Sequence, residues 1–163
     1  MLPADHSELP FEMRAYERHQ TGVSLLMSHF FVGYLRDLYR LFEGDMALVI
    51  VLGEIAHHNM SAHFTVEAGG DRETMMRLDG DEGMRKRMPT CNAFSLSAAT
   101  GMPRETIRRK IAILEKKGWV ERGERREVRI TPKVGEYFKP DFNLNLLSGL
   151  LQTSDRIRSL MKT

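Results

Sequence analysis

The chain has 163 residues, of which 42% are hydrophobic and 28% are charged, and its formal net charge at neutral pH is +2. Such a composition is typical of a soluble globular chain with one or two small domains, and it excludes an intrinsically disordered one. The single cysteine, Cys91, excludes an internal disulfide and agrees with a reducing compartment. The polar N-terminus lacks a secretion signal, and the most apolar stretch, residues 46–53, is too short to span a bilayer. We therefore expect a cytoplasmic protein that does not enter the membrane.

The N-terminal part of the chain is expected to be helical. The first twenty or so residues are polar, which predicts a short helix or a loosely held arm. Over residues 23–42, apolar side chains recur every three or four positions, which is the stripe of an amphipathic helix. Gly44 ends this helix, and Asp45 is placed to cap a second helix over residues 46–60. A run of β-branched residues in the second helix would also fit a buried strand, but the length and spacing favour a helix.

A long insertion is expected in the middle of the chain. Residues 65–90 contain four glycines and no sustained apolar stripe. We interpret them as a flexible insertion with one short helix near residues 72–78, because loops of this length are usually functional or disordered.

Two helices separated by a tight turn are expected next. Residues 95–101 predict a short helix that Gly101 closes, and a longer helix begins at Pro103 or Arg104 and ends at Gly118. Proline is favoured at the first helical position because its missing N–H would be unpaired there in any case.

A hairpin and two further helices complete the chain. Residues 119–131 predict strand, turn and strand around Gly123. A short helical piece covers residues 132–138, and residues 142–162 form an amphipathic helix. The apolar residues on or near one face of this last helix are Leu146, Leu147, Leu150, Leu151 and Ile157.

Basic residues are concentrated in these later segments. Residues 101–133 contain eleven lysines and arginines and five glutamates, a local net charge of +6, which leaves −4 for the rest of the chain. A basic segment on an otherwise acidic chain is expected of a protein that binds a polyanion, although a run of charges is more often a solvated surface. Charge alone does not decide between the two.

The period of the longer helix predicts the direction of its basic side chains. At about 100° per residue, its apolar positions form one buried stripe, and Arg108 and Arg109 lie on the opposite arc together with Arg104. Lys110 lies at the border, where its stem can cover the core while its amine reaches water. The buried stripe consists of Ile107, Ile111 and Leu114.

Two helices around a tight turn, followed by a basic hairpin, are the arrangement that places a recognition helix in the major groove of DNA and a wing on the adjacent backbone. The segment "SLSAATGMPRETIRRKIAILEKKGWVERGERREVRITPKVGEYF", residues 95–138, resembles the winged helix-turn-helix of bacterial transcriptional regulators, and its exit "ITPKVGEYF" is similar to that of MarR-type repressors. The chain departs from that family in its long insertion and in Phe94, which stands where a serine or threonine commonly caps the first helix. Asn92 or Ser95 is expected to cap instead.

The predicted fold is mainly α with a small β-hairpin wing, a winged helix-turn-helix flanked by N- and C-terminal dimerisation helices. Residues 1–44 form the N-terminal arm and dimerisation helix, and residues 140–163 form the C-terminal dimerisation helix. Residues 45–139 form the DNA-binding domain, with the insertion at about 65–90. Each terminal helix has an apolar stripe that the small motif cannot cover, which predicts a homodimer.

The expected function is sequence-specific binding of double-stranded DNA to regulate transcription. The recognition helix, about 103–117, enters the major groove, and the wing, about 121–129, lies on the backbone. An arginine fork can bind either guanine or a phosphate. The residues predicted to read bases are Arg104, Thr106, Arg108 and Arg109, and those predicted to contact phosphates are Arg122, Arg125 and Arg126.

Other interpretations stay open at this point. Glu105 and Arg109 have the spacing of a surface ion pair, and the wing arginines alternate with glutamates that could pair with them. A winged-helix module that binds a protein, or a DNA-binding protein with a structural or replication role, would fit the same segment. The sequence contains no nucleotide-binding glycine loop and no nucleophile elbow, so we expect no enzyme and no cofactor.

Three further features have an ordinary explanation that we favour. His57, His58 and His63 lack the partners of a tetrahedral metal site, so we expect no metal. Cys91 is expected to be an inert buried thiol rather than a redox sensor. The aromatic residues of segment 23–42 are better explained by packing than by an effector pocket, and whether a small-molecule effector binds stays open.

Overall fold

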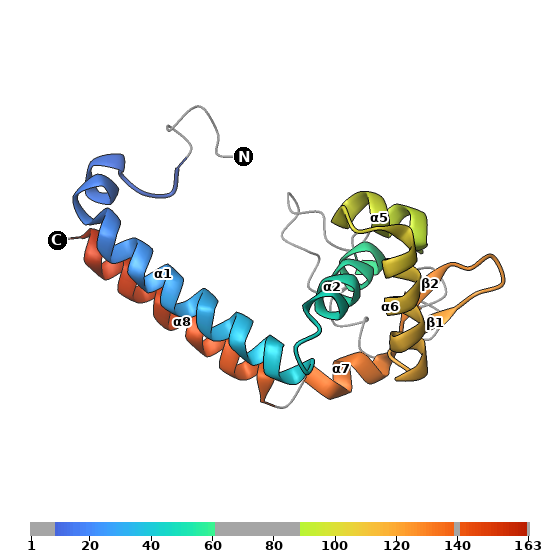
Figure 1. Cartoon of the computed structure of the whole chain (residues 1–163). Helices are drawn as coiled ribbons and strands as arrows, with labels where there is room; N and C mark the ends of the chain where they lie inside the picture. Colours follow the sequence, from blue (N-terminus) through green and yellow to red (C-terminus); the bar gives the residue numbers. More distant parts are fainter. Residues whose placement is uncertain (1–8, 61–88, 139–140, 163) are drawn as a thin grey trace. The chain divides into compact units, whose positions relative to one another are not determined.

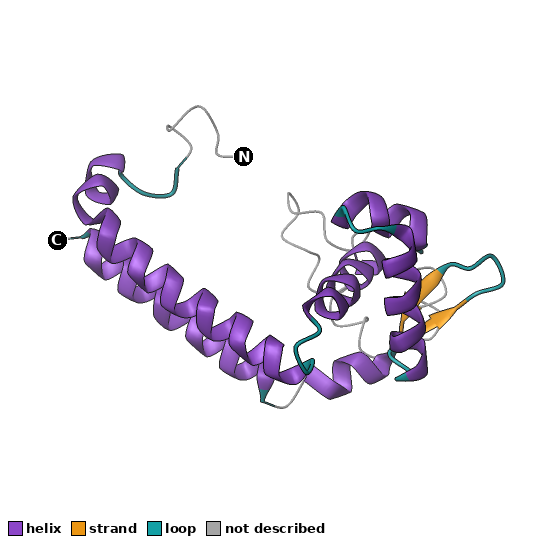
Figure 2. Ribbon diagram, in the orientation of Figure 1, coloured by secondary structure: helices purple, strands orange, loops and turns teal. Residues whose placement is uncertain are grey.

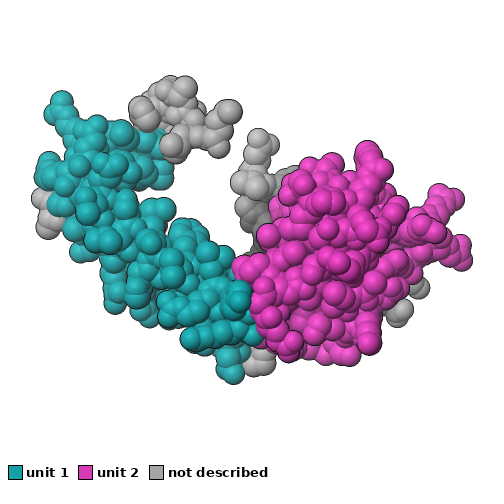
Figure 3. Space-filling view, in the orientation of Figure 1, with its two compact units in different colours: residues 1–40, 139–163 teal, residues 41–138 magenta. Residues whose placement is uncertain are grey.

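A computed structural model of the chain describes residues 9–60, 89–138 and 141–162. As predicted, the chain is mainly helical with a small two-stranded antiparallel hairpin (Figure 1 and Figure 2). It divides into two compact units, one comprising Met1–Arg40 and Lys139–Thr163 and the other Leu41–Phe138 (Figure 3). Nearly all of the insertion predicted at 65–90, including the short helix near 72–78, lies outside the described residues.

Two long helices form the first unit. Helix α1 (Met13–Leu41) and helix α8 (Phe142–Met161) lie side by side and run antiparallel (Figure 1). The prediction of a separate short helix or arm over the first twenty residues was wrong for residues 13–20, which belong to α1. These residues lack an apolar stripe, but Pro10 precedes them and no proline or glycine interrupts them, so nothing breaks the helix.

The two helices approach closely where glycines face side chains. A Cβ atom placed on Gly22 would lie 2.8 Å from Cδ2 of Leu160, and one on Gly149 would lie 3.5 Å from Cε2 of Phe30. Nearer the other end, the rings of Tyr34 and Phe142 lie 6.0 Å apart between centroids. Despite these contacts, no residue of α8 is fully buried, so much of the apolar surface of this helix is exposed.

The second unit contains the main core. Helices α2 (Met46–Met60), α5 (Ala93–Thr100) and α6 (Arg104–Lys116) pack on one another, and α2 also packs on strand β2 (Val128–Ile130). Strand β1 (Val120–Arg122) pairs with β2 in antiparallel register, and α7 (Pro132–Phe138) follows the hairpin. The buried apolar side chains of this unit are Phe42, Leu48, Val51, Leu52, Ile55, Cys91, Leu96, Ile107, Ile111, Leu114, Trp119, Val120 and Val128.

The hairpin has a third pairing partner that the sequence did not predict. Cys91 forms an isolated antiparallel bridge with Val128, whose N–H donates to the Cys91 carbonyl at 2.8 Å. A single residue before α5 therefore extends the two-stranded sheet and ties the helix to the hairpin.

Asp45 caps α2 as predicted, but its second partner was not foreseen. Its Oδ1 accepts the N–H of Leu48 at 3.0 Å, and its Oδ2 lies 2.6 Å from Nζ of Lys110 on α6. The Lys110 side chain, predicted to lie at the border of the core, is 12% exposed and pairs with this carboxylate. Burial alone would raise the pKa of Asp45, but the hydrogen bonds from Lys110 and Leu48 and the charges of Lys110 and Arg109 lower it below its ordinary value.

Candidate nucleic-acid interface

The start of α5 is fixed by a capping box. Asn92 Oδ1 accepts the N–H groups of Phe94 and Ser95 at 2.9 and 3.1 Å, and the Asn92 N–H donates to Ser95 Oγ at 3.0 Å. Asn92 is thus the cap and Ser95 its reciprocal partner, so both residues considered from the sequence take part. This arrangement fixes the backbone of Phe94 on the first turn of the helix.

A short, hydrogen-bonded turn joins α5 to α6. Gly101 closes α5 with φ of 71°, a left-handed conformation that glycine adopts without steric cost, and its N–H donates to the Ser97 carbonyl. Ser97 Oγ donates to the Met102 carbonyl at 2.7 Å, and the Met102 N–H donates to Thr100 Oγ1 at 3.2 Å. Pro103 occupies the cap position of α6, so the helix begins at Arg104, the later of the two predicted starts. The turn therefore has little freedom, and the two helix starts are held in a defined relation.

Helix α6 directs its apolar stripe inward and its arginines outward, as predicted. Ile107, Ile111 and Leu114 are at most 2% exposed, whereas Arg104, Arg108 and Arg109 are exposed. Thr106 is half-buried.

The structure brings four of the predicted residues together. A hollow of about 320 Å³ lies between the start of α5, the exposed face of α6 and the hairpin. None of the residues that line it is acidic, so it carries a concentration of positive charge. The arginines that line it are Arg108, Arg122, Arg125 and Arg126, and Asn92 and Phe94 form part of its wall.

Ion pairs satisfy these arginines only in part. Arg122 Nε lies 3.0 Å from Glu115 Oε2, and Arg108 Nη1 lies 3.5 Å from Glu105 Oε2. Glu105 therefore pairs with Arg108 rather than with Arg109, the partner considered from the sequence. Among the described residues, no ion pair involves the Arg125 or Arg126 side chain. Within the hairpin, Arg129 Nη1 lies 4.0 Å from Glu127 Oε1, so its alternating charges form ion pairs in part.

The backbone of the hairpin loop has an unusual conformation at Arg126. The Arg125 N–H donates to Glu127 Oε2 at 2.9 Å, and the Arg126 N–H donates to the Gly123 carbonyl at 3.1 Å. Arg126 has φ of 62°, a left-handed conformation that costs a residue with a side chain about 1 kcal/mol relative to glycine. A sequence argument would have assigned such a backbone to Gly123, whose φ is not positive.

Three of the predicted residues, Arg104, Thr106 and Arg109, are not among those that line the hollow. Arg104 stands at the first position of α6 with its Cζ 4.4 Å from the centroid of the Phe94 ring. Arg109 contributes to lowering the pKa of Asp45, which places it on the flank of α6 that faces the start of α2. Phe94 was not predicted as part of the site, although an aromatic residue in the first turn of the helix is a signal that could have indicated it.

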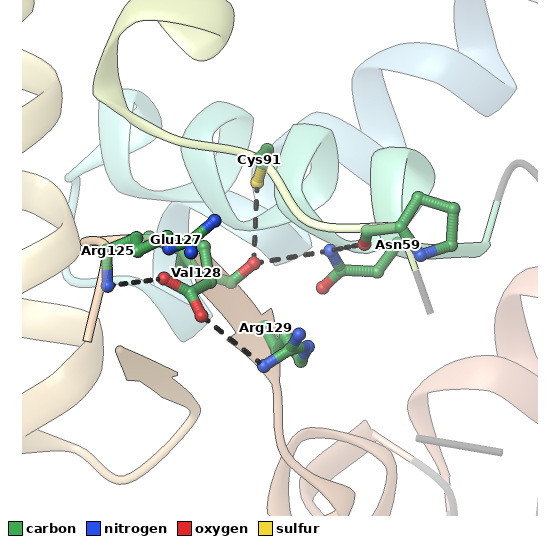
Figure 4. A network of polar contacts seen from close by, with 7 residues as sticks. Asn59, Cys91, Arg125, Glu127, Val128 and Arg129 are labelled. Carbon is green, nitrogen blue, oxygen red and sulfur yellow. Dashed lines mark hydrogen bonds and ion pairs between the residues drawn. The ribbon is translucent and has the colours of Figure 1, made fainter. Parts of the chain in front are cut away.

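A buried polar network anchors the root of the hairpin. Asn59 on α2 is fully buried; its amide donates to the carbonyls of Pro89 at 2.8 Å and Val128 at 3.3 Å, and its oxygen accepts the Ile130 N–H at 2.8 Å. The Cys91 thiol donates to the same Val128 carbonyl at 3.7 Å (Figure 4). Asn59 thus links three segments through groups that would otherwise be buried without partners.

Cys91 is buried, as expected. Burial raises the pKa of its thiol to about 11, and the nearby charge of Glu54 adds to the effect. The described residues contain no cluster of histidine, cysteine and carboxylate side chains that could hold a metal ion. His63 lies outside them. In the part of the chain that the structure describes, no helix has both the length and the apolar character needed to cross a bilayer.

No protein-family model, curated protein or solved structure matches this chain.

Proposed function

We propose that the chain is a homodimeric, cytoplasmic regulator of transcription that binds specific sequences of double-stranded DNA. Helix α5, the turn at 101–103, helix α6 and the hairpin would act as a winged helix-turn-helix of the kind found in MarR-type repressors, with no catalytic step and no cofactor. The observation that carries the proposal is the hollow between α6 and the hairpin, which gathers four arginines. A concave surface of this charge is complementary to the phosphate backbone of DNA.

The two sides of the hollow suit different tasks. Helix α6 exposes Arg104, Arg108 and Arg109 at its N-terminal half, the part of a recognition helix that reaches base edges in the major groove. The hairpin would contribute Arg122, Arg125 and Arg126 to the backbone beside that groove. A guanidinium fork can bind paired acceptors of guanine or of a phosphate, so arginine serves on both sides.

The backbone of Arg126 supports this division. A left-handed position in a loop is usually occupied by glycine, asparagine or aspartate, because their steric penalty is low. Retaining arginine there has a cost in stability, and a contact made by its side chain would account for that cost.

The homodimer is supported by an exposed apolar surface on the α1–α8 pair. On α1, residues with about half or more of their surface exposed repeat at helical spacing, and α8 has a similar set. Monomeric proteins rarely expose contiguous apolar surface of this extent. The residues are Leu25, Phe31, Val32, Leu35 and Tyr39 on α1 and Leu144, Leu147, Leu150 and Leu151 on α8.

Helix geometry turns both exposed stripes away from the contact between the two helices. At about 100° per residue, each stripe lies about 150–180° around its helix from the residues that contact the other helix. One side of the pair carries polar residues such as Arg36 and Gln152. A second copy of this unit, related by a two-fold axis, would cover part of the exposed apolar surface.

Selection from a random duplex pool tests DNA binding. We expect one enriched pseudo-palindrome, with half-sites about one helical turn apart. Arg108→Ala should weaken binding and relax the preference at one position, whereas Arg126→Ala should lower the salt slope of log affinity by about one with the preferred sequence unchanged. Lys162→Ala removes the same charge from the other unit and serves as the matched control. Weak binding that is indifferent to sequence would contradict the proposal and favour a structural role on DNA or a protein partner.

Sedimentation equilibrium tests the dimer. We expect a dimer for the natural chain and a folded monomer for Leu147→Glu, which places a charge in the proposed apolar interface. Gln152→Glu adds the same charge on the polar side and should stay dimeric. A monomeric natural chain would refute the dimer while leaving the DNA-binding surface to be judged by the selection experiment.

A further inference from the structure

Phe94 is an unusual residue for its position. The residue is 62% exposed, and α5 already has a buried apolar anchor in Leu96, so the core does not require the ring. It lies at the start of α5, on the wall of the arginine-lined hollow. The role of this side chain therefore depends on its contacts at the surface and not on the core.

The contact with Arg104 supplies that role. The Cζ atom of Arg104 lies 4.4 Å from the centroid of the Phe94 ring, within the range of a cation–π interaction. Among the described residues, no ion pair involves Arg104, in contrast to Arg108 and Arg122, which lie near glutamates. The aromatic ring is thus the group that restrains this guanidinium.

Both partners of the contact have fixed backbones. The N–H of Phe94 is bound by the side chain of Asn92, and Arg104 directly follows Pro103, whose ring limits the backbone at the helix start. An arginine side chain otherwise loses considerable rotamer freedom when it is ordered on a partner. Holding it in place before DNA arrives reduces that loss.

The chemistry of guanidinium explains why a ring is suited to this task. The five N–H donors of arginine lie in the plane of the group, whereas a stacked cation–π contact uses the face of the guanidinium and leaves these donors free. A guanidinium restrained in this way keeps donors for a planar pair of acceptors. Guanine O6 and N7 in the major groove and two oxygens of a phosphate both provide such a pair.

We infer that Phe94 is a positioning residue that holds Arg104 at the start of α6 ready for a paired acceptor of DNA. The inference rests on the proposed function and assigns to Phe94 a role that acts through Arg104 rather than through a contact of its own. Asn92 and Ser95 form the capping box of α5, so the side chain of Phe94 has no part in capping the helix.

A double-mutant cycle on the duplex selected by the natural protein tests the inference. Phe94→Leu keeps an apolar side chain but removes the π face, and we expect it to weaken binding about two- to five-fold, the range of an exposed cation–π contact. Phe94→Tyr should restore natural affinity, because it retains the ring. In the Arg104→Ala background, Phe94→Leu should produce no further change. The melting temperature of each variant reports folding, and we expect little change because Phe94 is exposed.

Each outcome separates the possibilities. An equal loss from Phe94→Leu with and without Arg104 would overturn the inference, because Phe94 would then contact DNA by itself. Natural affinity of Phe94→Leu would overturn it as well. If the natural chain selects no sequence, the proposed function fails and this inference fails with it, whereas a selected sequence bound equally by Phe94→Leu refutes the inference alone. Arg104→Ala distinguishes the acceptors: a salt slope lowered by about one indicates a phosphate, and an altered base preference with an unchanged slope indicates guanine.

Discussion

Replacing Asn59 should test whether buried hydrogen bonds hold the hairpin on α2. Leucine has nearly the same shape as asparagine but no polar atoms, so Asn59→Leu removes the hydrogen bonds without leaving a large cavity. The Ile130 N–H and the Pro89 carbonyl, which Asn59 contacts at 2.8 Å each, would lose these partners. The Val128 carbonyl would keep the weaker Cys91 thiol donor at 3.7 Å.

The expected magnitude follows from these partners. A buried polar group left without a hydrogen bond costs about 1–3 kcal/mol, so two such groups lower the free energy of unfolding by about 2–6 kcal/mol. This is a large part of the roughly 5–15 kcal/mol that stabilises an ordinary domain. His57→Leu, an exposed position on the same helix, should change stability by no more than about 0.5 kcal/mol and serves as the control.

Asn59→Asp separates the acceptor from the donors. Aspartate can still accept the Ile130 N–H, but its ionised form places a buried charge against two carbonyl oxygens. Burial raises the pKa of the introduced carboxyl above its unfolded value, so the folded state binds more protons than the unfolded state above about pH 4. The stability deficit of this variant relative to the natural chain should therefore shrink as the pH falls from 7 toward 4.

Urea unfolding followed by fluorescence gives the measurement. Trp119 is the chain's single tryptophan and is 6% exposed, in the same unit as Asn59. Protein concentration has to be held constant, because the proposed dimerisation would contribute to apparent stability. The argument would be refuted by an Asn59→Leu variant within about 0.5 kcal/mol of the natural chain, or by an Asn59→Asp deficit that does not change with pH.

Three other predictions concern the same unit. Asp45→Asn keeps the cap of α2 but removes the negative charge that pairs with Lys110, and it should lower the free energy of unfolding by about 0.5–1 kcal/mol. Asp45→Ala also removes the cap and should lower it by about 1 kcal/mol more, as measured by urea unfolding. Because the folded pKa of Asp45 is lowered, its contribution is present above about pH 4 and is lost on acidification through the folded pKa, so Asp45→Ala should show a weaker acid dependence. Cys91, with a pKa raised to about 11, should react with iodoacetamide at pH 8 only in urea, and rapid labelling of the folded chain would contradict its burial. Gly53→Ala within α2 should raise the free energy of unfolding by about 0.5–1 kcal/mol, whereas Gly101→Ala, at a φ of 71°, should lower it by about 1 kcal/mol. Neither added Cβ has a neighbour within 4 Å, so the two effects depend on the backbone alone. Changes of the same sign would contradict this argument.

The features that the sequence predicted depend on neighbouring residues. Asp45 caps the helix that begins at the next residue, and Gly101 ends the helix directly before it. The apolar stripe of α6 follows from the period of a helix, and the outward direction of Arg108 follows from that stripe. Such features need only propensity, spacing and the conformational limits of single residues.

The features that it did not predict depend on distant pairings. Asn59 bonds to residues 30 and 71 positions away, and Lys110 pairs with Asp45, 65 positions away. Nothing local to Asn59 distinguishes it from an ordinary polar residue near the end of a helix. A stripe pattern also does not predict which leucines of α8 are exposed. The pattern shows that one face of the helix is apolar, but it does not show which partner covers that face.

Anchoring at the root of the hairpin has a consequence for the proposed interface. Asn59, the Cys91 bridge and the bond from Thr131 Oγ1 to the Gly118 carbonyl at 2.7 Å all fix the segment near β2, whereas Arg125 and Arg126 lie in the loop beyond it. The side chains of Arg125 and Arg126 have no ion pairs among the described residues, so the loop takes its position from bonds made at its base and from the backbone bonds within it. Loosening the base by Asn59→Leu should leave the base preference set by α6 unchanged, yet reduce the salt slope of DNA binding, since fewer hairpin arginines would be held near phosphates. A loss of base preference with an unchanged slope would instead show that Asn59 acts on α6 and not on the hairpin.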